Sequence, residues 1–282
     1  MDYFAGIDIG SRTAKGVIIG GDTTAASLAL PTGMNYTKAA EDLLAGLLEA
    51  AKTPRESISL VVATGQGAGN VSYAHRDASD IICCARGAIR QLPDACTVID
   101  IQSQSSQIIR LAADGLVTKH LASEKCAAGS GRFMEVIANV LQVNLEDIGA
   151  LSANAKNPIS FTTGCAVFGE SEAISRVAEG ITKEDILAGV HEALARKILA
   201  MANRIGLEPP VAVCGGGAFD TGLVTAIKNS LGTEVTVIPQ PQMVTALGAA
   251  ILAQEESKLP PEERTRRTNH ESFTRESLRE DI

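Results

Sequence analysis

One layout occurs twice in this chain, and it constrains the fold more than any other feature of the sequence. An apolar strand predicted at Tyr3–Ile9 leads through a polar, glycine-marked turn into a second strand at Val17–Ile19. A second copy begins at Thr97–Ile101, passes another polar turn and resumes at Gln107–Leu111. Each copy is therefore predicted to be a β-hairpin, and the repeated pattern indicates an internal duplication.

Each copy carries an aspartate near the end of its first strand, Asp8 and Asp100. The turn after Asp8 can direct backbone N–H groups, hydroxyls and one ammonium at phosphate oxygens, while the carboxylate could hold Mg2+ through water. A duplication would set the two carboxylates on facing hairpins beside a cleft for a metal-bound nucleotide. An ordinary hairpin turn explains the first copy about as well, because glycine and serine favour turns whatever the function. The spacing is not that of a Walker A motif.

Between the two copies, apolar residues at helical spacing over 37–52 precede a strand at Ser59–Ala63. The order strand, helix, strand predicts an α/β domain. A glycine run at 65–69 follows that strand, but its spacing differs from that of a dinucleotide fingerprint. We therefore interpret this run as a flexible connection.

Two cysteines, Cys126 and Cys165, stand in small, flexible turns that are each predicted to open a helix. The helix after Cys165 is predicted from the apolar residues Val167, Phe168, Ile174 and Val177. A thiolate iron–sulfur cluster usually needs four cysteine ligands, so two such turns make half a site that a second subunit would complete. Helix N-termini also favour the negative charge of a thiolate-bound cluster. The pattern predicts a redox centre on a subunit interface.

Another glycine-rich turn follows a strand predicted at Val211–Cys214. This strand enters three adjacent glycines, Gly215, Gly216 and Gly217, before a predicted helix. Three adjacent glycines are rare inside a helix or strand, and they permit very close approach of the backbone to a base or a phosphate. The alternative is a tight strand-to-helix turn, for which one glycine usually suffices. We favour nucleotide contact.

Composition narrows the class of protein. The chain has 282 residues, 45% of them hydrophobic, a formal net charge of −8, 3% aromatic residues and no tryptophan. These values predict a sizeable core and give little support to nucleic-acid binding. No stretch has the length and apolarity of a membrane span and no signal peptide is recognisable, so the expected location is the cytoplasm. The charged segment 257–282 is predicted to be a flexible or partner-bound tail.

Four motifs together resemble the family of iron–sulfur ATPases that comprises the activators of 2-hydroxyacyl-CoA dehydratases and the ATPase subunits of benzoyl-CoA reductases. These motifs are Gly6–Ser11, Lys125–Phe133, Cys165 with Glu170–Glu172, and Gly215–Gly217. The resemblance covers about residues 3–254. It implies two related α/β lobes of the acetate-kinase, sugar-kinase, Hsp70 and actin type, which is ribonuclease H-like. The implied lobes are 1–95, completed by part of 245–256, and 96–244, which carries the two cysteines.

The resemblance also implies roles for the candidate residues. Cys126 and Cys165 would be the ligands that this chain gives to a 4Fe-4S cluster shared with a homologous ATPase subunit. Reduced ferredoxin would donate electrons, and a CoA-ester reductase would receive them through ATP-driven transfer. The residues implied for Mg2+ and ATP are Asp8 and Asp100 for the metal–nucleotide, Gly10, Ser11, Thr13 and Lys15 for phosphate, Gln104 for water, and Gly215, Gly216 and Gly217 for adenosine.

One segment departs from the pattern of the family. The second phosphate motif of the family reads Asp-Ile-Gly-Gly-Gln-Asp, whereas this chain has Asp100-Ile101-Gln102-Ser103-Gln104-Ser105. Side chains therefore stand where backbone should approach phosphate, and Ser105 replaces a carboxylate that could organise Mg2+ or water. Two outcomes are consistent with this change. Either a homologous partner holds the more complete ATP site in a heterodimer, or the binding geometry is altered and this chain still hydrolyses ATP.

Within the family, the short length and the charged tail favour the smaller ATPase subunit of a benzoyl-CoA reductase, an enzyme of aromatic ring reduction. Alternatives stay open beside it. One is an activator of a 2-hydroxyacyl-CoA dehydratase. Another is a cluster-free small-molecule kinase of the same fold, in which the two cysteines would have no task. A nucleotide-responsive assembly or chaperone-like module is a further class.

Overall fold

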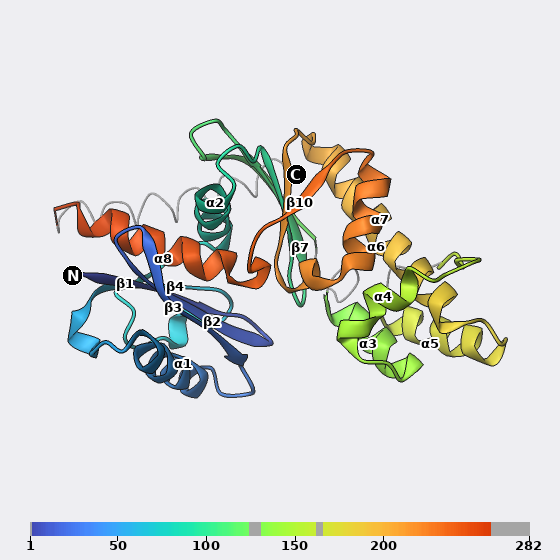
Figure 1. The fold of residues 1–282 in the computed structure, drawn as a ribbon, viewed down its shortest axis with the longest axis horizontal. Coiled ribbons are helices and arrows are strands. Elements are labelled where there is room, and N and C mark those ends of the chain that lie inside the picture. The colour runs from blue at the N-terminus through green and yellow to red at the C-terminus, as the bar shows by residue number, and fades with distance from the viewer. Residues whose placement is uncertain (1, 124–130, 162–165, 261–282) are drawn as a thin grey trace. The chain divides into compact units, whose positions relative to one another are not determined.

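The computed structural model describes residues 2–123, 131–161 and 166–260 of the chain (Figure 1). The chain divides into two compact units. Lobe 1 comprises 1–93, 115–117 and 242–282, and lobe 2 comprises 94–114 and 118–241. Most of the predicted tail, from residue 261 onward, lies outside the described residues.

Lobe 1 is a five-stranded mixed sheet in the order β3-β2-β1-β4-β5. Its strands are β1 (Tyr3–Ile9), β2 (Thr13–Gly20), β3 (Thr23–Pro31), β4 (Ile58–Thr64) and β5 (Arg76–Asp77). Helix α1 (Tyr36–Ala51) covers one face, and α8 (Val244–Ser257) covers the other, with α2 (Asp80–Gln91) packed on α8 (Figure 1). Because both faces are covered, β1 is buried from Phe4 to Ile9.

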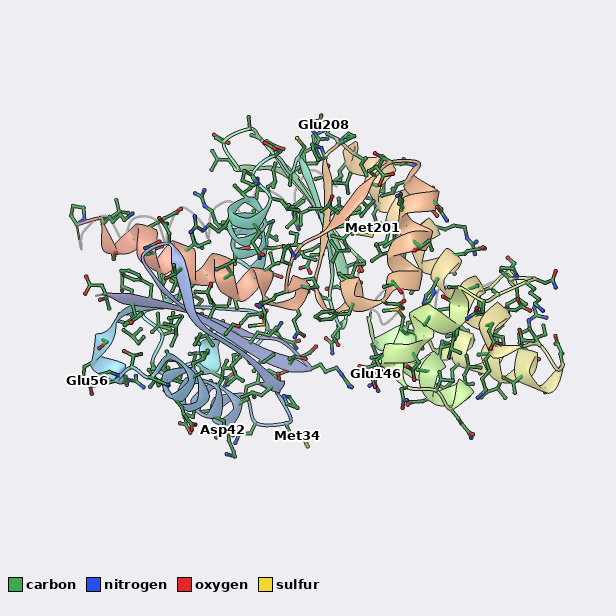
Figure 2. All side chains as sticks on the ribbon, in the orientation of Figure 1. Met34, Asp42, Glu56, Glu146, Met201 and Glu208 are labelled. Carbon is green, nitrogen blue, oxygen red and sulfur yellow. The ribbon has the colours of Figure 1, made fainter. Side chains whose placement is uncertain are left out.

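Lobe 2 has a five-stranded sheet in the order β8-β7-β6-β9-β10. Its strands are β6 (Thr97–Ile101), β7 (Ser106–Leu111), β8 (Val117–Ala122), β9 (Val211–Cys214) and β10 (Val235–Val237). Its helices are α3 (Gly131–Leu141), α4 (Ile148–Ser152), α5 (Ala166–Ala178), α6 (Lys183–Ile205) and α7 (Thr221–Leu231). The central strands and α3, α6 and α7 share one apolar core. Met201 of α6, labelled in Figure 2, is buried in it.

The two sheets have the same construction. In each, the first strand pairs antiparallel with the second and parallel with the fourth, and the fourth pairs parallel with the fifth. The prediction of two related α/β lobes is confirmed. Strands 3–9 and 97–101 lie where they were predicted, whereas β2 begins at Thr13 rather than Val17. The early start follows from pairing on both sides, since Thr13 faces Pro31 of β3 and Ala14 faces Ile9 of β1.

The helix predicted after Cys165 is present as α5, but its apolar residues do not all face the core. Phe168, Ile174 and Val177 are 68%, 54% and 46% exposed, whereas Ala173 is fully buried. Their spacing explains this, because positions 168 and 177 lie on opposite sides of a helix with 3.6 residues per turn. In the described part of the chain, none of the helices has the length and apolarity needed to cross a membrane.

Candidate functional site

In lobe 1, the predicted site residues gather at one turn of the sheet. Asp8, which is 6% exposed, faces Lys15 directly across the β1–β2 hairpin. Lys15 Nζ donates to Asp8 Oδ2 at 2.6 Å, and the two side chains are 16% and 9% exposed. The lysine predicted to contact phosphate therefore lies on the carboxylate predicted to organise Mg2+. The ammonium of Lys15 offsets the negative charge of Asp8, a buried carboxylate that would otherwise be costly to remove from water.

The turn between Asp8 and Lys15 is anchored by Thr32, the residue after β3, and closed by its own backbone. Gly10 N–H donates to the Thr13 carbonyl at 3.2 Å, and Thr32 Oγ1 donates to the Gly10 carbonyl at 2.8 Å. Thr32 N–H also donates to the Arg12 carbonyl at 2.9 Å. Ser11 is half-buried on this turn. The fixed backbone holds the predicted phosphate contacts of Ser11 and Thr13 within a few residues of Asp8.

A second turn contacts Asp8, and it is the glycine run that we interpreted as a flexible connection. Thr64, at the end of β4, is the parallel partner of Asp8. The next residue, Gly65, has φ +86°, and a Cβ on it would lie 2.4 Å from Asp8 Oδ1. Gly67 N–H then donates to the Ile9 carbonyl at 2.9 Å. The run is thus an ordered part of the aspartate site, and the interpretation as a flexible connection is wrong. We call Asp8, Lys15 and Gly65 the lobe 1 cradle.

Lobe 2 holds Asp100 by a different set of side chains. Asp100 is 2% exposed and faces Gln107 across the β6–β7 hairpin, at the position that Lys15 has in lobe 1. Gln107 Nε2 donates to Asp100 Oδ2 at 2.9 Å, and Gln102 Nε2 donates to the same oxygen at 2.7 Å. Gln104 is exposed on the turn that follows. Two neutral amides therefore orient this carboxylate where lobe 1 uses an ammonium.

The triple glycine completes the lobe 2 site in the way that Gly65 completes the lobe 1 site. Cys214 is the parallel partner of Asp100, and Gly215 follows with φ +84°. A Cβ on Gly215 would lie 2.5 Å from Asp100 Oδ1 and 2.4 Å from the Ile101 carbonyl oxygen. Only glycine fits this conformation and this contact. We call Asp100, Gln102, Gln107 and Gly215 the lobe 2 cradle.

The residues of the two cradles fit Mg2+ and a nucleotide. Carboxylate oxygens are the ligands that Mg2+ prefers, and each cradle presents one aspartate at the end of a strand. Beside Gly216 there is open space, because a Cβ on it would meet no atom within 4 Å. A flat group could therefore approach the backbone there, and the adenosine contact of these glycines stays a prediction. The helix predicted after the glycines is α7, whose N-terminus is capped by Asp220.

The predicted cluster ligands, Cys126 and Cys165, lie outside the described residues. The described chain resumes after them at Gly131 and Ala166, where α3 and α5 begin. Gly131 N–H donates to the Gln102 carbonyl and Arg132 N–H to the Ser103 carbonyl, both at 2.9 Å. The start of α3 is therefore bonded to the turn that follows Asp100, a connection that sequence reasoning missed.

Comparison with known proteins finds a family and curated relatives that match most of the chain. The BadF/BadG/BcrA/BcrD ATPase family model matches residues 5–253. The activator of lactoyl-CoA dehydratase from Anaerotignum propionicum is 40% identical over 90% of this chain and 98% of its own length. The 2-hydroxyisocaproyl-CoA dehydratase activator from Clostridioides difficile is 38% identical over 91% of this chain and 96% of its own length.

Solved structures support the fold. The activator of the 2-hydroxyisocaproyl-CoA dehydratase from Clostridium difficile, solved with bound ADPNP, has a TM-score of 0.86 at 37% identity and covers 91% of this chain and 96% of its own. A ROK family glucokinase from Streptomyces griseus, solved with glucose and AMPPNP, has a TM-score of 0.57 at 15% identity over 90% of this chain and 99% of its own. The latter likeness shows only that the predicted kinase-type fold is present.

The relatives also revise our preference within the resemblance. A benzoyl-CoA reductase subunit from Thauera aromatica is 31% identical over 89% of this chain and 93% of its own length, below the 38% and 40% of the two dehydratase activators. The comparisons thus favour the alternative of a dehydratase activator over a benzoyl-CoA reductase subunit. Since the family model covers most of the chain, this protein belongs to the BadF/BadG/BcrA/BcrD ATPase family.

Proposed function

We propose that this chain is the ATP-dependent activator of a 2-hydroxyacyl-CoA dehydratase. The observation that carries the proposal is the match along nearly the whole chain to activators of that class, together with two glycine-backed aspartate cradles suited to Mg2+ and a nucleotide. In this proposal Asp8 and Asp100 organise Mg2+–ATP, Gly10, Ser11, Thr13 and Lys15 contact phosphate, and Gly215–Gly217 accommodate adenosine. Gln104, exposed on the turn after Asp100, orients the water that attacks the terminal phosphate.

A bound 4Fe-4S cluster would supply the redox chemistry. We propose Cys126 and Cys165 as the ligands from this chain, with a second, homologous subunit giving the other two. Reduced ferredoxin would be the electron donor and the dehydratase the acceptor. Support comes from the placement of α3 and α5, since each begins within five residues of one of these cysteines. A helix N-terminus favours an anionic group nearby.

The first experiment tests the cluster. Protein purified without oxygen should contain about four irons per two chains and absorb visible light. Both Cys126→Ala and Cys165→Ala should lose the absorption and most of the iron. Cys96→Ala is the matched control, because Cys96 is a free, half-buried cysteine that we assign no ligand role. If both ligand variants kept the iron content of the wild type, the assignment would be rejected.

The second experiment separates the two electron acceptors. Each reaction would contain the wild-type protein, ATP and dithionite. One of three acceptors would be added: 2-hydroxyisocaproyl-CoA dehydratase, lactoyl-CoA dehydratase, or benzoyl-CoA reductase lacking its ATPase subunits. We expect dehydration of a 2-hydroxyacyl-CoA and no reduction of benzoyl-CoA. The opposite pattern would restore the benzoyl-CoA reductase assignment, which the 31% identity to the Thauera aromatica protein keeps as the second candidate.

A further inference from the structure

We propose that Gln102 couples the nucleotide site of lobe 2 to the helix that follows Cys126. Gln102 makes a hydrogen bond to Asp100 and another to the first residue of α3. Its side-chain Nε2 donates to Asp100 Oδ2 at 2.7 Å, and its main-chain carbonyl accepts from Gly131 N–H, at the start of α3, at 2.9 Å. The inference rests on the proposed function, in which Asp100 organises a Mg2+–nucleotide.

The turn around Gln102 is closed, so its side chain and main chain do not move independently. Gln102 N–H donates to the Ser105 carbonyl at 2.9 Å, and Ser105 Oγ donates to Gln102 Oε1 at 3.2 Å. The neighbouring Ser103 carbonyl accepts from Arg132 N–H at 2.9 Å. A change at the amide of Gln102 is therefore passed to the backbone of 102–103 and on to α3.

The two carbonyls of the turn satisfy the first N–H groups of α3. A helix leaves its first four N–H groups without partners inside the helix, so acceptors from elsewhere fix how the helix begins. Here those acceptors come from a turn 29 residues earlier in the chain. Displacement of the turn would loosen or redirect the first residues of α3, which follow the segment that contains Cys126.

Nucleotide binding would act on Gln102 through competition for one oxygen. Asp100 Oδ2 already accepts from two amides, so Mg2+ or a metal-bound water that engages this oxygen has to displace a donor. Gln107 is 3% exposed and fixed in register on β7, whereas Gln102 is half-buried on a turn. Gln102 is therefore the donor that gives way, and its release changes the support of α3.

The test measures the amides of α3 and nucleotide binding separately. Hydrogen exchange at Gly131 and Arg132 would be followed by NMR, with and without Mg2+–ADPNP, and affinity would be measured by calorimetry. In the wild type, loss of one supporting hydrogen bond should speed exchange at these amides by about fivefold when the nucleotide binds. In Gln102→Ala the amide that fixes the turn on Asp100 is gone, so exchange should already be as fast as in the nucleotide-bound wild type and should not respond further, while the affinity is equal or higher.

Ser103→Ala is the matched control. It shortens a neighbouring side chain of the same turn and keeps the carbonyl that accepts from Arg132 N–H, and the Ser103 hydroxyl makes no hydrogen bond among the described residues. This variant should keep the fivefold response. Gln102→Asn, one methylene too short to reach Asp100 in the same way, replaces Gln102→Ala if circular dichroism shows that the alanine variant is unfolded.

Each outcome is informative. A wild type that does not bind Mg2+–ADPNP overturns the proposed function and the coupling with it. A wild type that binds the nucleotide without a change at Gly131 and Arg132 overturns the coupling alone. The coupling also fails if Gln102→Ala and Gln102→Asn bind nucleotide and respond as the wild type does.

Discussion

The two lobes hold their strand-end aspartates in the same backbone frame but with different side chains. In lobe 1 the residue that faces the aspartate is Lys15, and in lobe 2 it is Gln107. The glycine behind the aspartate is the same in both, with φ of +86° at Gly65 and +84° at Gly215. The copies have thus kept the backbone contact and diverged in how the carboxylate is supported.

The comparison shows which part of each cradle the fold requires, namely the glycine, and which part can differ between the lobes, namely the side chain that faces the aspartate. A Cβ at either glycine would approach the aspartate to within 2.5 Å, so both cradles need the same backbone. The facing side chain is free to change because an ammonium and an amide both donate to the carboxylate. The ammonium also neutralises its charge, whereas the amides of Gln102 and Gln107 orient the lobe 2 carboxylate without adding a positive charge.

The largest effect is expected from the glycines. Alanine at Gly65 or Gly215 would take up a left-handed conformation and press on an aspartate oxygen and a carbonyl, so each substitution should lower the free energy of unfolding by about 2 to 4 kcal/mol. Gly69→Ala and Gly216→Ala are the controls, because a Cβ there would meet no atom within 4 Å. These two control substitutions should change the free energy of unfolding by no more than about 0.5 kcal/mol.

Urea unfolding, with hydrogen exchange followed in each lobe, would measure these changes. Similar losses for Gly65→Ala in lobe 1 and Gly215→Ala in lobe 2 would support the shared backbone frame. A loss at one glycine with no loss at the other would break the comparison.

A comparable or smaller effect is expected where the cradles differ. Lys15→Ala leaves Asp8 buried without its ammonium and should destabilise lobe 1 by about 3 kcal/mol. Lys15→Gln gives lobe 1 the side chain of lobe 2, keeps an N–H donor and should cost about half as much. In lobe 2, Gln107→Ala removes one of two amides from Asp100 Oδ2 and should cost about 1 to 2 kcal/mol. Equal losses for Lys15→Ala and Lys15→Gln would mean that the charge contributes nothing.

Much of the fold could be predicted from the sequence. The layout of strand, aspartate, polar turn and strand occurs twice, and the apolar residues of 37–52 have helical spacing. The same pattern predicted that Asp8 and Asp100 lie near the ends of strands, as they do in β1 and β6. The Gly65 turn was missed because its spacing matches no fingerprint, and only the pairing of β4 with β1 places it on Asp8. The same duplication was the signal that could have found it, since Gly65 follows the fourth strand of lobe 1 as Gly215 follows that of lobe 2.

Other parts of the site depend on contacts that no local pattern encodes. The sequence shows that Gln102 stands where the family has glycine, but not that its amide lies on Asp100 while its carbonyl supports α3. Periodicity predicted α5 as a helix without showing that Phe168 and Ile174 face outward. Such features depend on which segments pack together, which is decided by tertiary structure rather than by spacing.

The smallest expected effect is the loss of lobe 2 stability at acid pH. Asp185, in the first turn of α6, is buried and accepts from the N–H groups of Asn157 at 2.7 Å and Lys156 at 2.8 Å. The hydrogen bond from Asn157, assisted by those from Thr182 and Lys156, lowers the pKa of this carboxyl from its ordinary value of 3.8, against the opposing effect of burial. Because the folded pKa lies below the unfolded one, the stabilisation is present above pH 3.8 and is lost as the pH falls through the folded pKa.

Asp185→Asn keeps an acceptor of the same shape and removes the titration. We expect the wild type to be more stable than this variant at pH 7, and the difference to shrink below about pH 4 as the aspartate is protonated. Lobe 1 should show no such difference between wild type and variant, since Asp185 and its partners all belong to lobe 2. Urea midpoints at pH 7, 5, 4 and 3, with exchange resolved by lobe, would measure this. A difference that stayed constant from pH 7 to 3 would show that the contact stabilises lobe 2 through shape rather than charge.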